Sequence, residues 1–109
     1  MDAINQFVDL FTTVRYEDLP EPAIQAARQE VLDSLATAIG GRNARGISAL
    51  VELAREWGGK EQSTVIGHQL RCPAPNAARI NATMVHALDY DDGHQGAQVH
   101  ILSLIHISE

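Results

Sequence analysis

Residues 74–88 read APNAARINATMVHAL, and this stretch decides the fold. Pro73 and Pro75 lie at or near the first turn of the predicted helix, where proline is tolerated. Apolar side chains then occupy almost every side of the helix, which indicates burial on several sides. Three neighbouring helices could not easily supply that much cover, so we expect this helix to belong to a larger bundle.

Working outward, three more helices are predicted upstream, over residues 2–14, 21–39 and 47–57. In each of them apolar residues recur at helical spacing. Asp2 is a suitable N-cap for the first helix, and Pro22 suits the first turn of the second.

Gly40-Gly41 is expected to end the second helix, because glycine readily adopts the left-handed cap conformation, and Gly58-Gly59 is expected to stop the third. Trp57 is in phase with the apolar face of the third helix and is expected to anchor the core. The β-prone residues 63–67 predict a single edge strand or extended stretch, and His68 is expected at the surface. The predicted fold class is all-α, the N-terminal part of a helical-bundle domain, with about four helices and one short extended segment.

Composition narrows the classes of protein. The chain has 109 residues, of which 45% are hydrophobic and 20% charged, so it is expected to form one small globular domain. The net charge of −6 argues against nucleic acid as a partner. No run approaches the ~20 apolar residues of a membrane span. The single cysteine, Cys72, permits no internal disulfide, and no signal peptide is visible, so we expect a cytoplasmic protein.

The predicted helix of residues 74–88 runs directly into a cluster of ionisable residues. Carboxylates at the C-terminus of a helix face the negative end of its dipole, which is unfavourable. Local violations of this kind tend to mark functional sites. A purely structural alternative is that the aspartates cap the loop and the histidines hydrogen-bond to them. The cluster contains His86, Asp89, Asp91, Asp92, His94 and His100.

Two chemistries suit these side chains. Crowded carboxylates and imidazoles can serve as general acids and bases, in which case cations to hold a substrate's carboxylates must come from elsewhere. Alternatively, the aspartates, His94 and His100 could hold Mg²⁺, Mn²⁺ or Zn²⁺, although their spacing matches neither an EF-hand loop nor a zinc-protease helix. A terpene-cyclase interpretation of the Asp-x-Asp-Asp pattern is disfavoured by the aromatic content of 5%.

Several short motifs, taken in order, resemble the N-terminal part of the MmgE/PrpD family, which includes 2-methylcitrate dehydratase, cis-aconitate decarboxylase and iminodisuccinate epimerase. The resemblance covers residues 4 to 100. Its motifs are Leu19-Pro20, Val31-Leu32-Asp33-Ser34-Leu35 up to Gly40-Gly41, Trp57-Gly58-Gly59, Ser63-Thr64-Val65-Ile66-Gly67, Ala77-Ala78-Arg79-Ile80-Asn81-Ala82-Thr83, His86-Ala87-Leu88-Asp89-Tyr90-Asp91-Asp92 and His100.

The resemblance implies a lyase or isomerase that acts on small di- or tricarboxylates without a cofactor or metal. It also implies a large helical domain, a smaller α/β lid and a homodimer. Asp89 and His100 match the family's catalytic Asp and His, while Asp92, Gly93 and His94 fall in its substrate-facing loop. Several members have Thr where this chain has Gly93, so one hydroxyl is lost. The resemblance leaves dehydration, decarboxylation and epimerisation open.

The last residues do not continue the family pattern. Residues 102–109, LSLIHISE, resemble the translation of a sequencing-library adapter, so residues 1–100 are expected to be the N-terminal portion of the helical domain and 101–109 a non-native tail. His106 is therefore not counted as a ligand. The chain alone, lacking the lid and the substrate-holding lysines, is expected to be inactive and to form a molten, self-associating helical state. A second hypothesis is a small helical interaction module.

Overall fold

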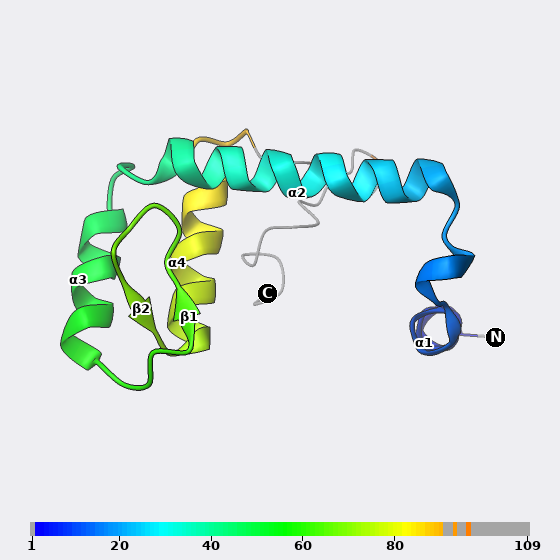
Figure 1. Cartoon of the computed structure of the whole chain (residues 1–109), viewed down its shortest axis with the longest axis horizontal. Coiled ribbons are helices and arrows are strands. Elements are labelled where there is room, and N and C mark those ends of the chain that lie inside the picture. The colour runs from blue at the N-terminus through cyan, green and yellow to red at the C-terminus, as the bar shows by residue number, and fades with distance from the viewer. Residues whose placement is uncertain (1, 91–92, 94–95, 97–109) are drawn as a thin grey trace.

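The computed structural model describes residues 2–90, 93 and 96, and the chain is mainly helical, as predicted (Figure 1). In chain order the elements are α1 (Ala3–Thr13), the 3-10 turn η1 (Tyr16–Asp18), α2 (Glu21–Gly41), α3 (Ile47–Trp57), β1 (Ser63–Thr64), β2 (Arg71–Cys72) and α4 (Ala74–His86).

Helix α2 forms a long rod, with different neighbours at its two ends (Figure 1). The elements α3, β1, β2 and α4 gather at its C-terminal end, whereas η1 and α1 lie at the other end. Among the described residues, the core lies at the C-terminal end of α2. Its buried apolar residues are Ala38, Ile47, Val51, Ala54, Val65, Cys72, Ala77, Ile80 and Met84.

Helix α4 is the most enclosed element, as its all-round apolar pattern predicted. Ala77, Ile80 and Met84 are buried, and every residue from 80 to 86 is buried or half-buried. Its neighbours are α2, α3 and both strands. The helix therefore ends, at His86, against the packed part of the molecule.

The single extended segment expected around residue 65 is in fact one arm of an antiparallel hairpin. Ser63 pairs with Cys72 and Thr64 with Arg71. The second strand escaped detection because two residues are too few to show the period-2 alternation of a strand. Long-range contacts hold the hairpin instead: Asn81 of α4 accepts a hydrogen bond from the Ile66 N–H at 2.9 Å and donates one to the Thr64 carbonyl at 3.1 Å.

The prediction that Gly40-Gly41 ends α2 in a left-handed cap was wrong. The helix continues through Gly41 to a C-cap at Arg42 in the right-handed region, and neither glycine has a positive φ. Gly41 is buried against α4. The prediction that Gly58 ends α3 was correct, although its φ of +62° and ψ of −144° lie outside the left-handed helical region.

Two further side-chain predictions need correction. Trp57 is 59% exposed, so it does not anchor the core of the described residues, although it is in phase with the buried face of α3. His68 is half-buried rather than fully at the surface, and its Nε2 is enclosed without a hydrogen-bond partner in the described part of the chain.

Candidate functional site

The candidate site begins where α4 ends. The Ala87 N–H donates to the Met84 carbonyl at 3.3 Å, and the Asp89 N–H donates to the His86 carbonyl at 3.0 Å. These bonds turn the chain tightly out of the helix. Asp89 is the first residue of the acidic loop, and its backbone is held by the last turn of α4.

Asp89 adopts φ +54° and is the one non-glycine residue with positive φ among those that the structure describes. Asp tolerates this left-handed region better than most residues, because its short polar side chain can bond locally. Even so, a conformation of this kind costs on the order of 1 kcal/mol and persists where the surrounding structure imposes it. Residues held in this way cluster at active sites.

The Asp89 side chain is accessible to solvent. Within the described residues, its carboxylate has no hydrogen bond or ion pair, and the neighbouring Tyr90 is 76% exposed. A fixed backbone that carries an unengaged, reachable carboxylate is suited to exchange a proton with a ligand or to bind a cation.

Of the other residues of the predicted cluster and loop, the structure describes two: His86, which is half-buried as the last residue of α4, and Gly93. Gly93 is exposed, and a Cβ added there would meet no atom of the described residues within 4 Å. Asp91, Asp92, His94 and His100 lie outside the described residues. The meeting of Asp89 with His100 therefore stays a prediction.

A metal site stays a prediction too. Among residues 2–90, 93 and 96, no three His, Cys, Asp or Glu side chains lie together as a metal ion would need. Of the proposed ligands only Asp89 belongs to that part of the chain, and one carboxylate does not make a site.

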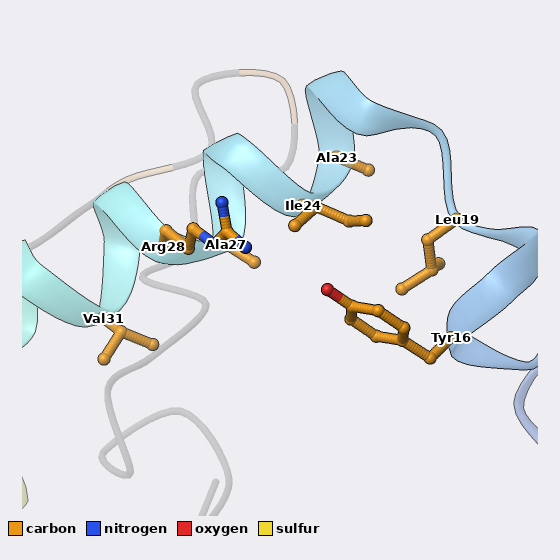
Figure 2. Close-up of a pocket in the computed structure, with 7 residues that line it drawn as sticks. All are labelled: Tyr16, Leu19, Ala23, Ile24, Ala27, Arg28 and Val31. Atoms are coloured by element: carbon orange, nitrogen blue, oxygen red, sulfur yellow. The ribbon is translucent and has the colours of Figure 1, made fainter.

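A second concave surface lies at the opposite end of α2 and was not predicted from the sequence. Figure 2 shows Tyr16 and Leu19 facing Ile24 and Ala27 of α2 across it. Its volume is about 360 Å³. It contains one charged group, Arg28, and no carboxylate or imidazole. We therefore do not assign the chemistry to this groove, which is lined by Tyr16, Leu19, Ala23, Ile24, Ala27, Arg28 and Val31.

None of the helices that the structure describes is both long enough and apolar enough to cross a membrane.

Comparison with known proteins identifies the family of the chain. A cis-aconitate decarboxylase-like protein, oryM of Aspergillus oryzae, is 24% identical over 94 residues, which are 86% of this chain and 20% of that relative. The chain thus spans about a fifth of the length of this curated relative. No solved structure matches it. The model of the MmgE/PrpD N-terminal domain matches residues 5–106, nearly the whole sequence, and we conclude that the chain belongs to the MmgE/PrpD family.

Proposed function

We propose that the protein to which this chain belongs is a lyase or isomerase of small di- or tricarboxylates, working by acid/base proton transfer without a cofactor. The observation that carries the proposal is Asp89, an accessible carboxylate in a strained turn at the end of the most enclosed helix. Family membership and the similarity to a cis-aconitate decarboxylase-like protein point to the same chemistry.

In this proposal Asp89 and His100 exchange the proton, while Asp92, Gly93 and His94 face the substrate. A loop this acidic repels a polycarboxylate, because like charges close together are destabilising. Cationic side chains from elsewhere in the full-length protein must therefore hold the substrate. We also propose a cytoplasmic homodimer for that protein.

The test uses the full-length gene product, assayed for dehydration of 2-methylcitrate, decarboxylation of cis-aconitate and epimerisation of an amino dicarboxylate. Asp89→Asn and His100→Gln should each lower kcat by a factor of about 10² to 10⁴, as loss of a general acid or base does. Asp9→Asn removes an exposed carboxylate of α1 and is the matched control. Full activity in Asp89→Asn would refute the assignment.

The alternative is a helical interaction module. Exposed apolar residues on α1 and α2, including Phe7, Phe11 and Leu32, favour it. Sequencing the source DNA across the His100 codon separates the two. A reading frame that continues past His100 into a further helical stretch supports the enzyme, whereas a gene that ends with residues 102–109 supports the module.

A further inference from the structure

The ends of α2 and α4 meet at the two glycines that were expected to cap α2. A Cβ atom added to Gly41 would collide with the backbone carbonyl oxygen of Met84 and come within 3.2 Å of the Ala87 Cβ. One added to Gly40 would lie 3.2 Å from the Leu88 Cδ1. The two helices therefore touch backbone to backbone at this point, which only glycine permits at position 41.

Gly40 and Gly41 lower the helical stability of α2, and this cost is not offset by a left-handed cap, because the structure has none there. Each glycine inside a helix is less favourable than alanine by roughly 0.5–1 kcal/mol. Neither Gly40 nor Gly41 uses the left-handed conformations that make glycine valuable elsewhere in this chain. Close approach of α4 is thus the physical use of this pair.

The residues that rest on the glycines lead straight to the candidate site. Met84, Ala87 and Leu88 are in contact with them, and Asp89 follows Leu88 directly. Asp89 is also tied to the last turn of α4 by its N–H bond to His86. A shift of the end of α4 away from α2 would consequently carry the Asp89 carboxylate with it.

We propose that Gly41, assisted by Gly40, is a positioning residue that sets the place of Asp89 by letting the end of α4 sit against the α2 backbone. Its consequence for catalysis rests on the proposed function, in which Asp89 carries a proton. At Gly41 the obstacle to a side chain is backbone, which cannot rotate aside, so α4 itself must move. At Gly40 the obstacle is the tip of a flexible leucine, so the disturbance is smaller.

The first experiment measures position without activity. Tyr90 follows Asp89, so 3-fluorotyrosine incorporated at position 90 alone, by amber-codon suppression in the full-length protein, reports on the site by ¹⁹F NMR. Gly41→Ala should shift the Tyr90 resonance strongly and Gly40→Ala weakly. Gly58→Ala is the matched control. It strains the backbone, because Gly58 has φ +62°, but its new Cβ would meet no described atom within 4 Å, so the Tyr90 resonance should not move.

The second experiment measures kcat and KM in the full-length protein. A displacement of about 1 Å can cost 10²-fold in rate, so Gly41→Ala should lower kcat about a hundredfold with KM little changed. Gly40→Ala should lower kcat less, and Gly58→Ala should lower thermal stability but not kcat.

The inference is overturned if a folded Gly41→Ala variant keeps both the Tyr90 resonance and kcat, or if Gly58→Ala loses as much rate. Should Gly41→Ala fail to fold, Gly40→Ala decides, and an unchanged resonance and kcat in that variant count against the inference. Retained activity in Asp89→Asn would instead refute the proposed function, while the ¹⁹F shifts would still show whether Gly41 sets the place of this loop.

Discussion

The C-terminal end of α2 and the middle of the helix carry the same kind of apolar residues but have different surroundings. At the C-terminal end Thr37, Ala38 and Gly41 are buried beneath α4. In the middle of the helix Val31 and Leu32 are 60% and 70% exposed, although they belong to the same predicted helix and the same apolar pattern. Helical periodicity thus shows which faces are able to pack, and the presence of a partner decides which of them do.

Helix α1 extends the contrast. It has a well-formed N-cap, in which the Asp2 side chain accepts the Ile4 N–H at 3.4 Å, and its Phe7 and Phe11 rings stack with centroids 6.1 Å apart. Even so, it buries none of its residues within the described chain. Local signals are sufficient to form this helix, but they do not give it a place in the core.

The largest expected difference between the packed region and the exposed middle of α2 comes from truncating one apolar side chain in each. Met84→Ala empties a fully buried position and should lower the free energy of unfolding by about 2–5 kcal/mol. Leu32→Ala in the exposed middle of α2 should change it by less than about 0.5 kcal/mol. Urea unfolding of both variants checks this, and equal effects would mean that the packed end is not the stable unit.

Loss of the Asn81 side chain should have the next largest effect, because this residue joins α4 to the hairpin. Asn81→Ala leaves the Ile66 N–H and the Thr64 carbonyl without their partner and should cost about 1–3 kcal/mol. Asn76→Ala, on the same helix and also half-buried, is the control. Amide hydrogen exchange at Ile66 should accelerate in Asn81→Ala and not in Asn76→Ala. Equal exchange rates in the two variants would contradict the role of Asn81.

A smaller change of opposite sign is expected at Asp89. Asp89→Gly relieves the positive φ and should stabilise the packed end by up to about 1 kcal/mol, while abolishing any activity that depends on the carboxylate. Asp89→Asn keeps the backbone preference and should leave the melting temperature almost unchanged. Destabilisation by Asp89→Gly would show that the side chain, and not the turn, supports the end of α4.

The smallest effect on stability is predicted for the exposed end. Phe7→Ser with Phe11→Ser should alter the free energy of unfolding by less than about 0.5 kcal/mol, because both rings are exposed. The same double variant should reduce self-association in sedimentation velocity, since exposed apolar patches promote it. An unfolding midpoint that falls steeply would mean that α1 packs against the core in solution.

Much of the fold was predictable because its signals are local. Four helices were predicted to within two residues of their ends. The signals were the Asp2 cap, the proline in the first turn of α2, the glycine stop after Trp57 and the periodic apolar residues. The order of short motifs also indicated the family, which the match over residues 5–106 confirms. For the site, the sequence pointed to Asp89, and the predicted role of His100 is still to be tested.

The sequence by itself therefore determined where the helices lie, which family the chain belongs to and where its acidic loop begins, since each of these depends on residues that are neighbours along the chain. Tertiary structure decided the rest. The pairing of β1 with β2, the exposure of Trp57, the packing of Gly41 on α4 and the left-handed turn at Asp89 all depend on what each residue meets across space. Residues far apart in sequence create those contacts, and local periodicity carries no information about them.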